Sequence, residues 1–385
     1  MFKAFKYRIY PTESQKELIN KHIGACRFIY NLALETKNTA YLGAKHTLTA
    51  FDLIRQIPDL KKECPWLKEI GAQTLQFPIL SLSVAYTRFY KGLGDFPKFK
   101  SKHKGKQSFN SGQNIKIKNN LLFIIKFKEG IKIELHRPLK GVIKTATISR
   151  TCTGKYYASI LCDTKEDVPP KPPVTEQNTV GIDLGIKSFL VTSDGQEYAN
   201  PTFYKKSLSK LKYVQRKYSK YKGKRTKHEL ALIHEKVANQ RKDFLQKLST
   251  KLIRENQSIA IESLDVKGMA QNRQLAQSIG DVGWGMFSDM LKYKAEWYGN
   301  NILPIGKFDP SSKTCSSCGD INSTLELKHR TWTCNGCGTK HDRDINAAIN
   351  IKSIALKTNV SGTDTKTQDE LPTLVGVLTP EACNG

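Results

Sequence analysis

The sequence lacks any apolar run close to the roughly 20 residues that a membrane-spanning helix needs. Its first residues, MFKAFKYRIYPTESQ, lack the apolar core of a signal peptide. Acidic residues are also scarce, since 35 Asp and Glu stand against 62 Lys and Arg and leave a net charge of +27. We therefore expect a cytosolic protein with a polyanionic partner. Nucleic acid is the leading candidate for this partner, because basic side chains that neutralise its phosphates release counterions and so drive binding. A membrane surface is the alternative partner.

The nine cysteines are an odd number, which argues against a disulfide framework in a cytosolic chain. Five of them are scattered, and we interpret these as small buried thiols or a tail residue: Cys26, Cys64, Cys152, Cys162 and Cys383. The other four form a C-x2-C-x15-C-x2-C pattern, which predicts a tetrahedral zinc site. They are Cys315, Cys318, Cys334 and Cys337. Because all four positions are filled by thiolates, the zinc is expected to be structural.

The pattern of apolar and polar residues changes along the chain. Residues 3–10 alternate as a strand does, and Thr12 with Gln15 predicts the capping box of a helix. Mostly helical patterns run to about residue 93, short strand patterns follow up to residue 162, and DVPPKPPVTEQN reads as a linker. Strand patterns, a basic helical hairpin, two further strands around a helix, the cysteine segment and a last helix come after it.

Three carboxylates stand out in the second half of the chain. Asp183 lies in TVGIDLGIK, Glu262 in SIAIESL, and Asp344 begins the helix DINAAINI. Taken singly, Asp183 fits a turn and Asp344 fits a helix N-cap. Burying unpaired charges on such apolar strands is costly, however, and a shared divalent cation, Mg²⁺ by preference, would offset that cost. Two such ions suit phosphodiester hydrolysis, and the element order matches an RNase H-like nuclease fold.

Eight segments together resemble the TnpB family, which are transposon-encoded RNA-guided nucleases related to type V CRISPR effectors. The segments are YRIYPTESQ, GACRFIYN, FPKFKSK, GIDLGIK, LIHEKVANQRKDFLQKLST, IESL, PSSKTCSSCG and HDRDINAAINI. They span residues 1–355 and are most specific within 180–352. The resemblance implies a multidomain α+β fold. It comprises an RNase H-like (RuvC) core with an inserted zinc ribbon, and an N-terminal β-barrel, the wedge, with an inserted helical recognition domain.

The expected domain boundaries follow from that resemblance. They are 1–11 for the first wedge strand, 12–95 for the helical recognition domain, 96–170 for the rest of the wedge, 171–178 for the linker, 179–310 for the RuvC-like core with its basic helical insertion, 311–340 for the zinc ribbon that binds target nucleic acid, 341–357 for the RuvC-like C-terminal helix, and 358–385 for a disordered tail.

The resemblance also implies an activity, namely that of a Mg²⁺-dependent RNA-guided DNA endonuclease of a transposable element. It would cut guide-complementary DNA next to a short adjacent motif by a two-metal mechanism. The implied cofactors are two catalytic Mg²⁺ ions and one structural Zn²⁺. The implied partners are a guide RNA from the transposon end and target double-stranded DNA, with no membrane. We expect a monomer in the prokaryotic cytosol or nucleoid.

Carried over by motif, the metal-binding catalytic triad falls on Asp183, Glu262 and Asp344. Asp342 is either a helper of this site or a solvated surface charge, and we favour the latter. The alternative function is an RNA-guided repressor that does not cut, but its relatives have lost the triad, which is complete here. A strand-joining transposase could use the same core, although the resemblance is to the accessory nuclease.

Basic segments are the candidate nucleic-acid contacts. Five lysines fall between Lys98 and Lys106, and residues 203–227 hold eleven basic residues and no acid. We expect them to follow phosphates of guide or heteroduplex, against the alternative of a solvated face. Tyr7 and Tyr10 either contact RNA or pack in the barrel. The individual candidates are Arg8, Lys98, Lys100, Lys102, Lys205, Lys206, Arg216, Lys224, Arg225 and Arg241.

Overall fold

A computed structural model describes residues 1–103, 105–272, 275–306, 309–326 and 329–360. The chain forms two compact units, Met1–Glu166 and a second that begins at Asp167, where the Pro-rich stretch starts. The expected mixed α+β multidomain architecture is thereby confirmed. Among the described residues, every helix is too short or too polar to cross a membrane. Residues 361–385 of the expected disordered tail lie outside the described residues.

The first unit contains a seven-stranded antiparallel sheet in the order β2-β6-β7-β1-β5-β4-β3. Its strands are β1 (Phe2–Tyr10), β2 (Gln107–Ser111), β3 (Lys116–Lys118), β4 (Leu121–Ile124), β5 (Phe127–Glu134), β6 (Val142–Arg150) and β7 (Tyr156–Asp163). Phe5, Tyr7 and Ile9 of β1 alternate into the core, as predicted for a half-buried strand. Since β2 and β3 are the ends of this order, closure of the sheet into a barrel stays a prediction.

Helices separate β1 from the rest of that sheet in sequence. They are α1 (Glu13–Ala44), α2 (Ala50–Arg55), α3 (Ile57–Glu63), the 3₁₀ helix η1 (Pro65–Glu69) and α4 (Ala72–Tyr90). The predicted capping box begins α1, because the Gln15 N–H donates to Thr12 Oγ1 at 3.3 Å and the Thr12 N–H donates to Gln15 Oε1 at 3.1 Å. Pro78 lies inside α4.

The second unit has a five-stranded sheet in the order β10-β9-β8-β11-β12. Its strands are β8 (Thr179–Leu184), β9 (Ser188–Thr192), β10 (Glu197–Ala199), β11 (Ser258–Glu262) and β12 (Asn301–Ile305). The pairs β8–β9 and β9–β10 are antiparallel, whereas β11 runs parallel to both β8 and β12. The sequence order of these strands is the one that we predicted from the apolar segments.

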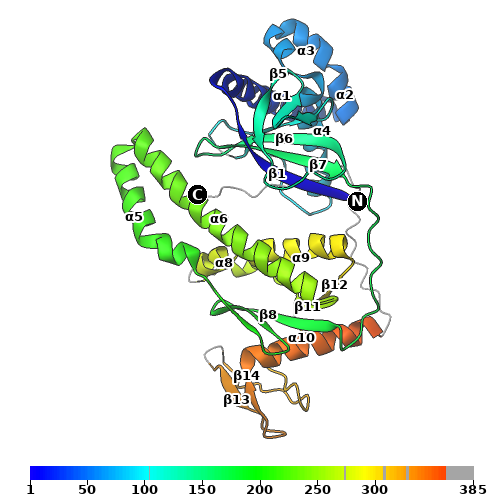
Figure 1. Ribbon diagram of the computed structural model, residues 1–385, viewed down its shortest axis with the longest axis vertical. Coiled ribbons are helices and arrows are strands. Elements are labelled where there is room, and N and C mark those ends of the chain that lie inside the picture. The colour runs from blue at the N-terminus through cyan, green and yellow to red at the C-terminus, as the bar shows by residue number, and fades with distance from the viewer. Residues whose placement is uncertain (104, 273–274, 307–308, 327–328, 361–385) are drawn as a thin grey trace. The chain divides into compact units, whose positions relative to one another are not determined.

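Helices cover both faces of this second sheet (Figure 1). The described helices of this unit are α5 (Phe203–Tyr221), α6 (Lys224–Glu255), α7 (Val266–Met269), α8 (Ala276–Val282), α9 (Trp284–Tyr298) and α10 (Arg343–Val360), and α5 packs on α6 rather than on the sheet. The apolar residues of α6 and α9 pack with Val180, Ile182, Ile259 and Ile261 on one face. On the other face α10 packs with Ala260 and β12. The last helix runs to Val360, three residues beyond the boundary that we expected.

Gly181 on β8 permits α10 to lie directly against the sheet. A Cβ at this position would clash with the carbonyl oxygen of Ala348 and would stand 2.8 Å from the Cβ of Lys352. We expect Gly181→Ala to lower the free energy of unfolding by about 1–3 kcal/mol or more, because the obstacle is backbone that cannot rotate away. Urea unfolding of the full chain measures the effect.

Gly280 in α8 is the matched control, since an added Cβ there meets nothing within 4 Å. We expect Gly280→Ala to be neutral or to stabilise by about 0.5–1 kcal/mol, the usual gain of alanine over glycine in a helix. Equal stability of the two variants would contradict the close packing of α10 on β8.

Candidate functional site

Three carboxylates meet at one edge of the second sheet. Side chains alternate along a strand, so Asp183 lies on the face of Gly181, which is the face that α10 covers. In the parallel register Ala260 pairs with Gly181 and Ile261 with Ile182, which places Glu262 level with Asp183. Both carboxylates therefore stand at the carboxyl ends of neighbouring strands, facing the same helix.

Asp344 joins them from the first turn of α10. The three groups are close enough to affect one another, because the charges of Asp344 and Glu262 both raise the pKa of Asp183. Burial is the larger cause, and the pKa of Asp183 reaches about 7. Burial also raises the pKa of Glu262, and the neighbouring Asp309 adds to that rise. The fold thus places the three predicted carboxylates within electrostatic reach of one another, although among the described residues only the four cysteines have ligand atoms within 4.8 Å of one another.

This carboxylate cluster fits a hard divalent cation. Burial raises the pKa of both Asp183 and Glu262, and the charges of Asp344 and Glu262 add to the rise for Asp183 while Asp309 adds to it for Glu262. A bound cation would reverse both effects by favouring the ionised carboxylates. Oxygen ligands with room for water are the environment that Mg²⁺ prefers.

Asp342 caps α10. Its Oδ1 accepts from the backbone N–H groups of Asp344 at 2.9 Å and Ile345 at 3.1 Å. Asp342 is exposed, as our preferred interpretation of a solvated surface charge expected, and it also supplies the N-cap that we had considered for Asp344. Because the cap takes over the free N–H groups, the carboxylate of Asp344 remains available to the site, and the helix dipole favours its negative charge.

Two arginines that the sequence analysis did not single out flank the carboxylates. Arg330 Nη1 lies 3.3 Å from both carboxylate oxygens of Asp344, in a contact that is about half exposed on the arginine side. The charge of Arg343 lowers the pKa of Asp183, opposing the effect of burial. Neither arginine lies in a pattern that periodicity would detect, because each is placed by the turns of the cysteine segment.

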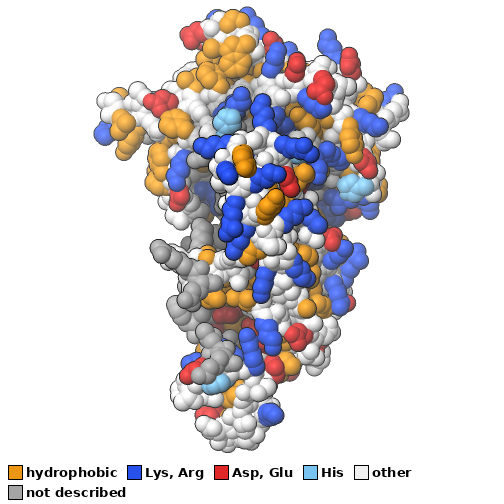
Figure 2. All heavy atoms as spheres, turned by 90° about the vertical axis from the view of Figure 1, so that its left-hand side faces the viewer, with side chains coloured by type: hydrophobic (Ala, Val, Ile, Leu, Met, Phe, Trp, Pro, Cys, Tyr) orange, Lys and Arg blue, Asp and Glu red, His pale blue; other side chains and the backbone are white. Residues whose placement is uncertain are grey.

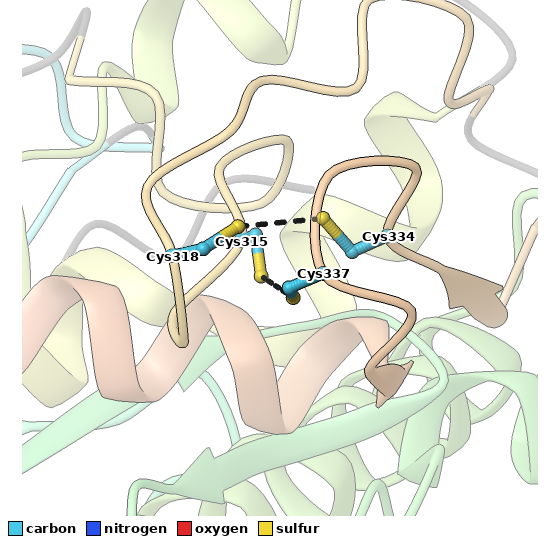
Figure 3. A group of neighbouring side chains, drawn as sticks. All are labelled: Cys315, Cys318, Cys334 and Cys337. Atoms are coloured by element: carbon cyan, nitrogen blue, oxygen red, sulfur yellow. Dashed lines mark hydrogen bonds between the residues drawn. The ribbon is translucent and has the colours of Figure 1, made fainter.

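The four predicted cysteines converge, two from each of two facing turns (Figure 3). Their sulfur atoms all lie within 4.8 Å of one another. Cys315 and Cys337 Sγ are 3.7 Å apart, and Cys318 and Cys334 Sγ are 3.6 Å apart. A tetrahedral zinc with Zn–S bonds of about 2.3 Å requires sulfur separations of about 3.8 Å. The cluster is therefore compatible with a zinc site.

Tight turns with a glycine in the left-handed region surround the cysteines. Gly319 and Gly338, which follow the second cysteine of each pair, have φ of +81° and +70°. Their N–H groups donate to the carbonyls of Cys315 and Cys334, both at 2.9 Å. A hairpin of β13 (Thr331–Thr333) and β14 (Lys340–Asp342) holds the second turn and leads directly into α10.

His341 of β14 is a contact of this cluster that its sequence position did not suggest. Its ring stacks on buried Trp332 with centroids 4.9 Å apart. Its Nε2 lies 3.0 Å from Cys315 Sγ. In the tautomer protonated at Nε2 it donates a hydrogen bond to this sulfur, which stabilises a thiolate ligand.

The basic hairpin of α5 and α6 carries most of the candidate nucleic-acid contacts. Figure 2 shows Lys and Arg side chains gathered over the face that this hairpin presents. The exposed candidates on it are Lys205, Lys206, Arg216, Lys224 and Arg225. Arg241 differs, because its guanidinium is part of the internal packing. It donates to the Asp281 carbonyl at 2.7 Å and pairs with the Asp281 carboxylate at 3.3 Å.

The candidate nucleic-acid contacts of the first unit also differ in the surroundings of their charged groups. Lys98 and Lys102 are exposed, and Lys98 pairs with Asp95 at 3.4 Å. The ammonium of Lys100 lies 3.8 Å from the centroid of the Tyr30 ring, and burial lowers its pKa. Lys100 is an exposed residue whose ammonium also lies on the Tyr30 ring.

Arg8 lies on the outer face of β1. Its guanidinium is 5.0 Å from the Tyr157 ring and 5.5 Å from the Tyr10 ring, and its Nη1 is buried without a hydrogen-bond partner among the described residues. Tyr10 is 46% exposed, whereas Tyr7 is fully buried in the core. We had left open whether the two tyrosines contact RNA or pack in the barrel. Tyr7 packs inside the core, whereas Tyr10 remains available for contact with RNA.

Three protein-family profiles match the chain. They are described as "Probable transposase" at residues 159–273, "Cas12f1-like, TNB domain" at 284–351 and "Helix-turn-helix domain" at 1–45. The second match covers the four-cysteine segment together with the start of α10. Residues 1–45 hold strand β1 and the single long helix α1, so the third description does not correspond to two helices here.

Curated relatives match over nearly the whole chain. A "Putative RNA-guided DNA endonuclease" of Streptomyces pristinaespiralis is 35% identical over 378 residues, which is 96% of this chain and 93% of the relative. The "Putative RNA-guided DNA endonuclease InsQ" of Escherichia coli K12 is 28% identical, over 90% of this chain and 91% of the relative. A solved Cas12f1–sgRNA–target DNA complex shares the fold. Its TM-score is 0.55 at 14% identity, covering 91% of this chain and 98% of that one.

Proposed function

The chain belongs to the TnpB family of transposon-associated RNA-guided DNA endonucleases, and from that membership we propose that it cuts guide-complementary DNA at the Asp183–Glu262–Asp344 site. The observation that carries the proposal is the convergence of these three carboxylates at one sheet edge, with the pKa of Asp183 raised to about 7. Carboxyl groups with strongly raised pKa values, such as Asp183, gather at catalytic sites, which supports cleavage over binding alone.

Each carboxylate has a defined task in the proposed reaction. Asp183 and Glu262, fixed on neighbouring strands, and Asp344, fixed on the capped start of α10, would hold two Mg²⁺ ions. Divalent ions bound there would favour ionisation of a water nucleophile and would neutralise the leaving oxygen. The expected products carry 5′-phosphate and 3′-hydroxyl ends. Arg330, which reaches Asp344 from the cysteine segment, is placed to balance the charge of the scissile phosphate.

The proposed partners are a guide RNA derived from the transposon end and target double-stranded DNA, bound by a monomer of the prokaryotic cytosol. Pairing with the guide would read the target, while the protein reads the adjacent motif and the duplex shape. Support comes from the net charge of +27 and from the basic face of α5 and α6. We assign the phosphate contacts to the exposed candidates of that hairpin, together with Arg8, Lys98 and Lys102.

The hairpin assignment predicts a salt-dependent effect. The double variant Arg216→Ala/Arg225→Ala removes two exposed charges, and each lost phosphate contact lowers the slope of log K against log salt by about 0.7–0.9. We expect RNA affinity to fall by roughly three- to tenfold at physiological salt, measured by filter binding across a salt series. Lys247→Ala is the control, since Lys247 is as exposed but pairs with Asp243 at 2.7 Å. An unchanged slope in the double variant would contradict the assignment.

One experiment tests the function itself. The full chain is purified with its bound RNA, the RNA is sequenced, and DNA matching its variable end is supplied with Mg²⁺ beside a randomised flanking library. We expect cleavage only of matched DNA, with the flanking motif recovered from the cut products. Tight guide-dependent binding without cleavage would favour the repressor, and joining of DNA ends would favour the transposase.

A further inference from the structure

Two buried asparagines on α10 link the nuclease helix to the four-cysteine cluster. Asn346 is 1% exposed and Asn350 is 7% exposed, and they lie four residues apart, on one side of the helix. A buried amide is costly unless its donors and acceptor are bonded. The partners of these two amides therefore show what the helix is built to hold.

All of those partners lie in the backbone around the first cysteine turn. Asn346 Oδ1 accepts from the Ser316 N–H at 2.9 Å, and Asn346 Nδ2 donates to the Thr314 carbonyl at 2.8 Å. Asn350 Nδ2 donates to the carbonyls of Ser311 at 2.7 Å and Thr314 at 2.6 Å. The peptide groups on both sides of Cys315 are thus bonded to the helix that carries Asp344.

The second cysteine turn reaches the same helix by a different route. Cys334 and Cys337 lie between β13 and β14, and β14 continues through Asp342 into α10. The Arg343 N–H also donates to the Arg330 carbonyl at 2.7 Å. One pair of cysteines is therefore joined to α10 by the chain itself, and the other pair is joined to it by the two asparagines.

Together with the four sulfur atoms, these connections form a closed circuit of chain segments and contacts, which we call the ring. It passes from α10 through β14 to Cys334 and Cys337, across the cluster to Cys315 and Cys318, and back to α10 through the amide of Asn346. A metal ion at the cluster would close the ring at one point, and Asn346 closes it at another. Loss of either link removes one connection between the cluster and the start of α10, while β14 and the packing of α10 on the sheet remain.

We propose that Asn346 and Asn350 are positioning residues that couple metal occupancy of the four-cysteine cluster to the placement of Asp344. Two residues along a helix turn by about 200°, so Asn346 and Asp344 project to nearly opposite sides of α10. Asn346 acts on the carboxylate through the orientation of the helix. The inference rests on the proposed nuclease site, but its tests do not depend on cleavage.

The test compares Asn346→Ala with Asn359→Ala in the full chain with bound RNA. Asn359 lies on the same helix and bonds the Ala355 carbonyl of that helix at 2.9 Å, which makes it a matched control. For Asn346→Ala we expect zinc to transfer to a chelator roughly tenfold faster, as the loss of one or two hydrogen bonds predicts. We also expect Mn²⁺, followed by electron paramagnetic resonance, to bind the carboxylates on the order of tenfold more weakly. Asn359→Ala should match the wild type in both.

The kinetic signature separates positioning from general damage. We expect Asn346→Ala to require more Mg²⁺ for half-maximal cleavage and to have a lower kcat, with unchanged affinity for guide and target. If zinc release and Mn²⁺ affinity both equal those of the wild type, the coupling is refuted. The wild type could also fail to cleave DNA while zinc removal still weakens its binding of Mn²⁺. In that case the proposed function is refuted and the coupling stands.

A second measurement covers the case in which Asn346→Ala does not fold. Zinc is withdrawn from the wild-type complex by a chelator, and amide hydrogen exchange is followed in residues 343–350. We expect exchange in this stretch to rise at least tenfold, while exchange in α6 and α9 stays constant. Unchanged protection at the start of α10 would overturn the proposal.

Discussion

Asp183→Asn is expected to abolish DNA cleavage, with a loss on the order of 10³-fold or more, while guide RNA stays bound. Asparagine keeps the shape of the side chain but cannot supply the negative charge that two divalent cations require. Cleavage of matched DNA is measured under single-turnover conditions. The control is Asp194→Asn in the exposed turn after β9, which should cut at the wild-type rate. Wild-type activity in Asp183→Asn would remove the catalytic assignment.

The same substitution is expected to change the pH dependence of stability in buffer without Mg²⁺. The pKa of Asp183 is about 7 in the folded chain against 3.8 in the unfolded chain, so between these values the folded state holds the proton more tightly. Stability contributed by the protonated carboxyl is present below pH 3.8 and is lost as pH rises through about 7. The full loss is up to roughly 4 kcal/mol. Asp183→Asn should lack this loss and be the more stable protein at pH 8 by urea unfolding.

Cys334→Ser is expected to produce the second large effect, which is loss of bound zinc and of cleavage together. A structural zinc site contributes on the order of 10 kcal/mol of binding free energy that is also folding free energy, and an alcohol does not replace a thiolate ligand. Metal analysis should fall from one zinc per chain to none. Trp332, buried beside Cys334, should become exposed and shift its fluorescence to longer wavelength.

Cys152→Ser is the matched control, because Cys152 is exposed in the first unit. It should retain zinc and activity. The first unit folds around its own core, so Cys334→Ser should keep the stability of that unit. One zinc per chain in Cys334→Ser would show that three thiolates and His341 suffice, and would contradict the four-cysteine assignment.

Local sequence patterns predicted those elements whose signals are strong. Alternation predicted β1 and the capping box predicted the start of α1, because both depend on neighbouring residues. Strand β2, in contrast, was not predicted. Its residues QSFNS lack an apolar alternation, and the strand exists because β6 pairs with it from far along the chain.

Charge alone was a weaker guide to individual residues. Arg241 belongs to a basic segment, yet Asp281 holds its guanidinium within the fold. Lys100 is exposed, but its ammonium lies on the Tyr30 ring. Asp342 was interpreted as a surface charge, and it is exposed, but its Oδ1 also caps α10. For Arg241 and Lys100 the deciding partner lies on an element whose position sequence spacing does not reveal.

The sequence by itself determined which residues could perform the chemistry. Three carboxylates in apolar or helix-starting contexts and two C-x2-C pairs are chemically specific, and their side-chain types do not depend on the fold. Only the tertiary structure decided how they are connected. The parallel pairing of β8 with β11 sets Asp183 level with Glu262, and the amides of Asn346 and Asn350 attach the first cysteine turn to the helix of Asp344. Such links join residues distant in the chain through backbone groups that every residue carries, so no side-chain pattern records them.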